Sequence, residues 1–135
     1  IIYKRYFTKE IKEEKIIEEK DMRSPYEIVT EELNTLYKQE LIEKKELKRH
    51  YLQLTEIIKH YIEAQLSVSI LEKTSRETLT IIAQKIDSQT ESRLKNIFAV
   101  ADFVKYAKLT PSEQDHQDTK TRVKNVIERL KDIEK

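Results

Sequence analysis

Apolar side chains in this chain recur at the spacing of helices. In the longest such run, between residues 47 and 66, they return every three or four positions and so share one face of a helix. Shorter runs of the same kind cover residues 26–42 and 75–86, and another begins at residue 111. Each run predicts an amphipathic helix that packs its apolar face against the rest of the chain.

The segment 94–108 is the most uniformly apolar part of the chain. Its apolar side chains form two stripes that lie about a third of a turn apart on a helix. The first stripe is Leu94, Ile97, Phe98, Ala101 and Val104, and the second is Val100, Phe103 and Ala107. A helix that is apolar in nearly every direction belongs in the interior, so we expect the other helices to surround it.

Four copies of a capping pattern predict where helices begin. In each copy a Ser or Thr is followed three residues later by Glu, so that the two side chains can satisfy free amides at a helix start. The copies lie at 24–27, 74–77, 88–91 and 110–113, and each precedes an apolar run with helical spacing. Both prolines follow the first residue of a copy, at the first helical position, where proline is tolerated.

These signals predict an all-α fold, with about five helices in a compact bundle over residues 24–135. The connector Ser67–Ser69 interrupts the pattern after the long second helix, and we expect Val68, Ile70 and Leu71 to lie beneath the bundle. The absence of Gly from all 135 residues supports a helical class, because tight hairpins usually need it.

The composition excludes several kinds of chemistry. The chain has no Cys, which excludes disulfides, thiolate catalysis and thiolate metal sites. Its 26 basic and 25 acidic residues leave a formal charge of +1, so no large uniform field attracts nucleic acid or a membrane. Any such binding would have to use a local patch of charge.

We interpret residues 1–23 as a charged juxtamembrane stalk, and we expect it to form partial helix or to be disordered. Lys4, Arg5 and Lys9 are its first charged residues, and no acidic residue accompanies them. This is the polarity expected on the cytoplasmic side of a membrane span, although a frayed end of a soluble chain would look the same. No run of 18 apolar residues and no signal peptide is present in the chain itself.

No constellation in the sequence predicts a catalytic, cofactor or metal site. The histidines are His50, His60 and His116, and the first two lie ten residues apart, whereas a metal site needs two ligands three or four apart. His50 falls on the buried side of its helix, so we expect it to be a packed structural residue. We therefore predict that the protein is not an enzyme.

Two clusters of polar residues have competing interpretations. Asp102 and Lys105 interrupt the apolar segment, and beside Tyr106 they form either a possible partner surface or an ordinary intrahelical ion pair. The basic cluster of Lys44, Lys45, Lys48 and Arg49, with Glu46 inside it, either contacts phosphates and acidic lipids or is the solvated face of a helix.

The motifs resemble those of a known family. The chain is similar to the cytoplasmic C-terminal domain of BatD-like membrane proteins, which come from bacterial aerotolerance operons. The resemblance rests on Lys48-Arg49-His50-Tyr51 with Leu54, Ile58 and Tyr61-Ile62-Glu63, on Thr74-Ser75-Arg76-Glu77, and above all on Ala101 to Lys108 followed by Pro111. It covers about residues 25 to 112. Lys45 and Ser67 depart from the family, which often has Gly at those positions.

The resemblance implies a location and partners but no active site. It implies a non-enzymatic interaction domain of an inner-membrane protein, which faces the cytoplasm and follows a membrane span missing from this chain. The same operons encode a MoxR-type AAA+ ATPase and proteins with von Willebrand factor A domains, which are the expected partners.

The residues also leave open a function from another class. In this alternative the chain is a helical module that binds nucleic acid or a membrane surface in a salt-dependent way, through Lys44 to Arg49 and the stalk. No aromatic residue interleaves the basic cluster, so we do not expect a nucleic-acid partner.

Overall fold

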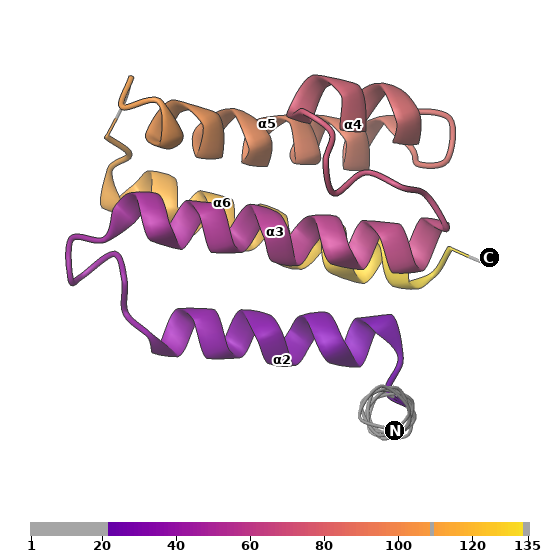
Figure 1. Ribbon diagram of the computed structural model, residues 1–135, viewed down its shortest axis with the longest axis horizontal. Helices are drawn as coiled ribbons and strands as arrows, with labels where there is room; N and C mark the ends of the chain where they lie inside the picture. The colour runs from indigo at the N-terminus through magenta and orange to yellow at the C-terminus, as the bar shows by residue number, and fades with distance from the viewer. Residues whose placement is uncertain (1–21, 109, 134–135) are drawn as a thin grey trace, which may run out of the picture.

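The computed structural model describes residues 22–108 and 110–133, and the regular secondary structure of this part of the chain consists of helices alone (Figure 1). Its helices are α2 (Pro25–Lys38), α3 (Leu47–Leu66), α4 (Ser75–Ile82), α5 (Ser88–Lys105) and α6 (Glu113–Lys131). The predicted all-α class, with about five helices in a compact bundle, is confirmed. The predicted stalk lies outside the described residues, except for its last two positions.

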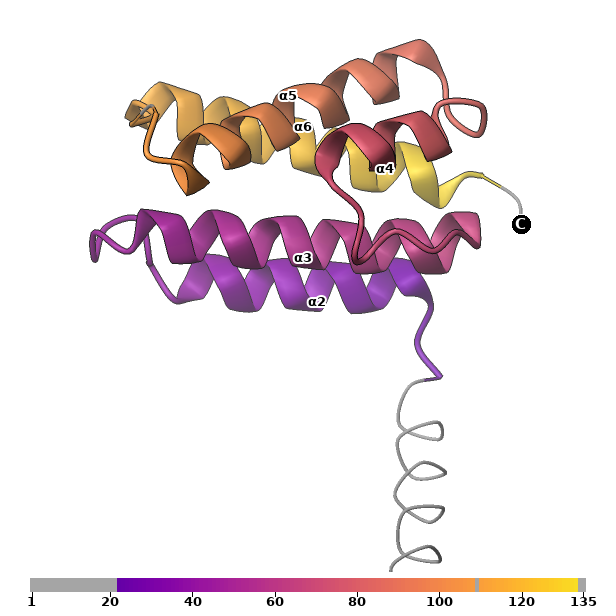
Figure 2. The same cartoon turned by 45° about the horizontal axis from the view of Figure 1, so that its top comes forward.

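The four long helices form an up-and-down bundle. Successive long helices run in opposite directions, and α2 contacts α3, α3 contacts α5, α5 contacts α6 and α6 contacts α2 (Figure 1). Contacts between α3 and α6 cross the centre of the bundle. The short helix α4 lies within the connection from α3 to α5 and packs on α5 (Figure 2).

The core runs between the four long helices and receives side chains from all of them. A single cluster contains its buried apolar residues, which are Val29, Leu33, Leu36, Leu41, Tyr51, Leu54, Ile58, Tyr61, Ile62, Leu66, Ile70, Ile82, Leu94, Ile97, Phe98, Ala101, Val104, Val123, Val126, Ile127 and Leu130. Each helix presents them at helical spacing, so burial of these stripes is the main force that assembles the bundle.

The prediction that the segment 94–108 is the central helix is wrong. Its first stripe is buried, but in the second stripe Val100 is only half-buried, Phe103 is 44% exposed and Ala107 is exposed. The helix α5 packs chiefly against α3, α4 and α6, and these neighbours leave part of its surface open. The helix α3, which contacts α2, α5 and α6, occupies the central position.

Two of the four predicted caps are confirmed. Ser24 accepts a hydrogen bond from the amide of Glu27 at the start of α2. Thr74 and Glu77 form the full reciprocal capping box at the start of α4.

The other two caps lie at neighbouring residues. Asp87, not Ser88, caps α5, because its carboxylate precedes the helix and reaches the third amide. Ser112, not Thr110, caps α6, which therefore begins after the proline. Both choices place a stronger or better-positioned acceptor at the first free amides.

A residue in the left-handed conformation follows each of the helices α2, α3 and α5. The helix α2 ends at Lys38 rather than near Ile42, and Glu40 then takes a positive φ. Lys45 and Ser67 also have positive φ values, of 63° and 56°. These backbone angles are the ones that favour glycine.

The connections around α4 are partly as expected. Ile70 is fully buried and Val68 is half-buried, but Leu71 is exposed, so the prediction for this connector holds for two of its three apolar residues. The helix α4 ends at Ile82, not at Ile86, because a tighter turn follows.

Candidate functional site

A groove lies between α3, the α3–α4 connection and α5. Its volume is about 590 Å³. Tyr51, Leu52 and Lys59 line it from α3, Ser75 lines it at the start of α4, and Tyr106 lines it at the end of α5. On α5 the groove is lined by the last part of the helix, at Ala101, Asp102 and Lys105.

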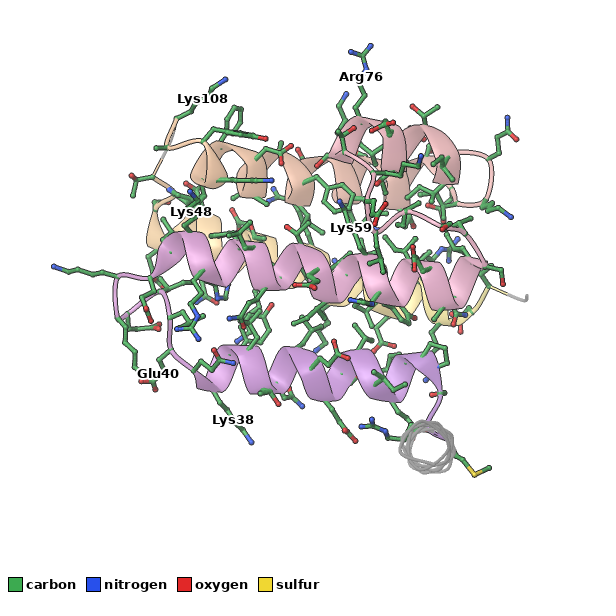
Figure 3. All side chains as sticks on the ribbon, in the orientation of Figure 1. Lys38, Glu40, Lys48, Lys59, Arg76 and Lys108 are labelled. Atoms are coloured by element: carbon green, nitrogen blue, oxygen red, sulfur yellow. The ribbon has the colours of Figure 1, made fainter. Side chains whose placement is uncertain are left out.

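Hydrogen bonds from α3 hold the wall of this groove in place. The Glu63 carboxylate accepts from the backbone amides of Ile70 and Leu71 at 2.6 and 2.9 Å. The Lys59 amine donates to the backbone carbonyl of Lys73 at 2.7 Å, and Figure 3 shows Lys59 between α3 and α4. The α3–α4 connection therefore has a fixed path although it contains no regular helix.

The three residues predicted as a possible partner surface all line this groove. Tyr106 is 62% exposed, and the Lys105 amine lies 5.6 Å from the centre of its ring, within reach of a cation–π contact. Asp102 accepts a hydrogen bond from the Ser75 hydroxyl at 3.4 Å. In the part of the chain that the structure describes, no ion pair joins Asp102 to Lys105.

The groove lining carries three lysines and three acidic residues, and the half-buried Lys59 lies among them. Burial lowers the pKa of Lys59, and the positive charge of Lys105 lowers it further, whereas Asp102 acts in the opposite direction. The two amines thus repel each other across the groove. An added negative charge between them would relieve this repulsion.

A second groove, of about 560 Å³, lies between α2 and α3. Its lining is more apolar and includes Ile28, Val29 and Ile57. None of the residues predicted as a partner surface reaches it, and it lacks a pair of facing amines. We therefore regard the α3–α5 groove as the candidate functional site.

A buried aromatic cluster joins α3 to the start of α6. The Tyr51 hydroxyl and His116 Nδ1 lie 2.6 Å apart, and their rings stack with centroids 5.7 Å apart. His50 packs edge-on against Tyr51 and lies 6.0 Å from the ring of Tyr37. The sequence did not reveal this cluster, because 65 residues separate Tyr51 from His116.

His50 is the most unusual residue in this cluster. It is 4% exposed, as its predicted structural role requires, and its Nδ1 makes no hydrogen bond. Burial, and to a smaller extent the nearby His116, lower its pKa to about 4, while Glu43 opposes the change. The residue is therefore neutral at physiological pH.

Lys45, Lys48 and Arg49 of the predicted basic cluster line one shallow pocket at the start of α3, and acidic residues lie among them. Arg49 pairs with Glu46 at 3.6 Å on the exposed side of α3. Lys48 stands at the same end of the bundle as Lys38, Glu40 and Lys108 (Figure 3). Lys4, Arg5 and Lys9, which we predicted to lie near a membrane, are outside the described residues.

The described residues contain neither a cluster of metal ligands nor a helix that could span a membrane. No group of three or more His, Asp and Glu side chains in residues 22–108 and 110–133 is placed to hold a metal ion. Among the helices that the structure describes, none is long and apolar enough to cross a membrane.

Comparison with known proteins gives the chain no relative. No protein-family model matches it, and no curated protein and no solved structure matches it either. The fold and the groove therefore define only the class of protein, a helical bundle with an open seam between two of its helices.

Proposed function

We propose that this chain is a non-enzymatic protein-interaction domain that binds its partners in the α3–α5 groove. One observation carries the proposal. Three separate stretches on which the resemblance to BatD-like proteins rests, residues 48–51, 74–77 and 101–108, all contribute side chains to this one groove. Exposed apolar and aromatic side chains at a preformed groove are typical of sites where helical modules bind other proteins.

The resemblance supplies the cellular setting of the proposal. The domain faces the cytoplasm, belongs to an inner-membrane protein, and acts with a MoxR-type AAA+ ATPase and proteins with von Willebrand factor A domains. Tyr106 and Lys105 are the side chains at the groove best placed to meet such a partner, because both are exposed.

The experiment is a binding measurement between the purified chain and the cognate ATPase and A-domain proteins, with ATP, with ADP and without nucleotide. We expect specific binding that depends on the nucleotide. Tyr106→Ala should weaken it by about tenfold or more, as for a typical aromatic anchor. Ile81→Ala is the matched control, because Ile81 is also exposed but does not line the groove.

Two outcomes would contradict the proposal. Absence of binding to every partner in every nucleotide state would exclude these partners. Equal effects of the two substitutions would place the binding surface elsewhere. Binding to nucleic acid or anionic vesicles that disappears at high salt would instead support the alternative function of the basic cluster.

A further inference from the structure

A small cavity lies at the end of the bundle where α2 ends and both α3 and α6 begin (Figure 1). Its volume is about 110 Å³. Its buried lining comes from the α2–α3 turn, from α3 and from α6, and consists of Leu41, His50, Tyr51, Leu54 and Thr119. Its charged lining residues are all exposed, and these are Glu40, Glu43, Glu113 and Lys120. The cavity therefore has a buried interior and a charged rim.

Two polar atoms of the buried lining have no hydrogen-bond partner among the described residues. They are His50 Nδ1 on α3 and Thr119 Oγ1 on α6. An unpaired buried polar atom costs free energy, and for this reason native proteins pair nearly all such atoms with other protein groups or with ordered water. Because both residues line the same cavity, one kind of occupant can serve both atoms.

The buried interior of the cavity offers hydrogen bonds but no charge. Burial holds the pKa of His50 at about 4, so its ring is neutral at physiological pH and has one donor and one acceptor nitrogen. The Thr119 hydroxyl both donates and accepts. The carboxylates and the single amine of the rim are exposed to solvent. The buried lining therefore favours a neutral occupant that can donate as well as accept.

The size of the cavity narrows the choice further. A water molecule takes up about 30 Å³ in the liquid, so a volume of about 110 Å³ has room for roughly three. Pockets that hold drug-sized organic ligands measure about 300 Å³ or more. Buried water typically makes about three hydrogen bonds to polar groups of the protein. Water therefore fits both the volume of the cavity and the chemistry of its lining.

We propose that this cavity binds a small cluster of ordered water molecules, which connects His50 Nδ1 on α3 with Thr119 Oγ1 on α6. The cluster adds a second polar link between these helices, beside the direct contact of Tyr51 with His116 at 2.6 Å. It also keeps a neutral imidazole paired in the interior of the bundle. The water site needs no partner protein, so it stands or falls independently of the proposed function.

The first experiment is a crystal structure of the complete wild-type chain at neutral pH, from crystals grown without small organic additives and at a resolution that shows ordered water. We expect water about 2.7–3.2 Å from His50 Nδ1 and from Thr119 Oγ1. In solution, nuclear magnetic resonance should detect cross-relaxation between long-lived water and the ring protons of His50 or the methyl protons of Thr119.

A matched pair of variants tests the role of the hydroxyl. Thr119→Val keeps the shape of the side chain but removes its hydroxyl, so the water bonded to it and its cross-relaxation signal should be lost. Thr78→Val is the control, because the Thr78 hydroxyl is also buried without a hydrogen bond but does not line the cavity. The control should leave the water signals at His50 unchanged. If Thr119→Val fails to fold, the wild-type crystal structure and spectra decide alone.

Three results would overturn the proposal. In the first, His50 Nδ1 bonds directly to a protein group such as the Glu43 carboxylate. In the second, side chains close the cavity and no water lies within it. In the third, the water signals survive Thr119→Val as fully as they survive Thr78→Val, which would mean that they come from water elsewhere on the protein.

Discussion

Replacing Ser67 by glycine should stabilise the protein. Ser67 follows the last residue of α3 in the left-handed conformation, with φ 56° and ψ 49°. A residue with a Cβ atom pays about 1–2 kcal/mol for this conformation. Glycine avoids that cost but loses about 0.5–1 kcal/mol more conformational entropy on folding. The difference predicts a net gain of roughly 0.5–1 kcal/mol in the free energy of unfolding for Ser67→Gly.

The measurement is urea-induced unfolding followed by circular dichroism, supported by thermal unfolding. For a chain of this size, a gain of 1 kcal/mol raises the melting temperature by roughly 3–5 °C. Ser67→Ala is the control, because it removes the hydroxyl but keeps the Cβ atom that causes the strain. We expect no gain from the alanine variant.

Two results would refute this reasoning. A glycine variant that is less stable than wild type would mean that the left-handed turn carries no strain worth relieving. Equal stabilisation by glycine and alanine would mean that the Ser67 hydroxyl, not the backbone, opposes folding.

Three further predictions concern the core, a cap and pH. Tyr61→Phe should cost about 1 kcal/mol in urea unfolding, because the buried Tyr61 hydroxyl donates to the carbonyl of Ile127 at 2.9 Å. Ser112→Ala should cost a similar amount, about 1 kcal/mol, in the same assay, whereas Thr110→Ala should change little, because only the former caps α6. His50 has a folded-state pKa of about 4, below the 6.5 of an ordinary histidine. Its neutral form therefore makes its full contribution to the free energy of unfolding above pH 6.5. That contribution, on the order of 2–3 kcal/mol, should be lost as the pH falls from 6.5 to 4, and His50→Asn should flatten the pH dependence of unfolding.

Local patterns in the sequence predicted the helices better than their arrangement. Apolar spacing predicted the helices, and the Ser and Thr caps predicted the starts of α2 and α4, because both signals act within a few residues. The central helix was assigned wrongly, since the apolar stripe with Phe103 indicated burial on every side. Whether a stripe is buried depends on which helices pack on it, and spacing along the chain does not contain that information.

Local sequence patterns likewise predicted only part of the candidate site. Asp102, Lys105 and Tyr106 stood out as polar or aromatic residues at the end of an apolar segment, and the groove does contain them. Lys59 did not stand out, because its role comes from the connection that folds back over α3. The contact between Tyr51 and His116 was missed for the same reason, since it joins helices that are distant in sequence.

Because successive helices run in opposite directions, the two ends of the bundle carry different parts of the chain. The beginning of α2 and the end of α6 lie together, where the Tyr26 hydroxyl bonds to Glu128 and the Lys131 amine lies 4.2 Å from the centre of the Tyr26 ring (Figure 1). The end of α5 lies at the other pole, one helix length away, which is about 27 Å for 18 residues. A tether attached at the start of α2 or at the end of α6 would therefore hold Tyr106 and the nearby end of the groove away from the tethering surface.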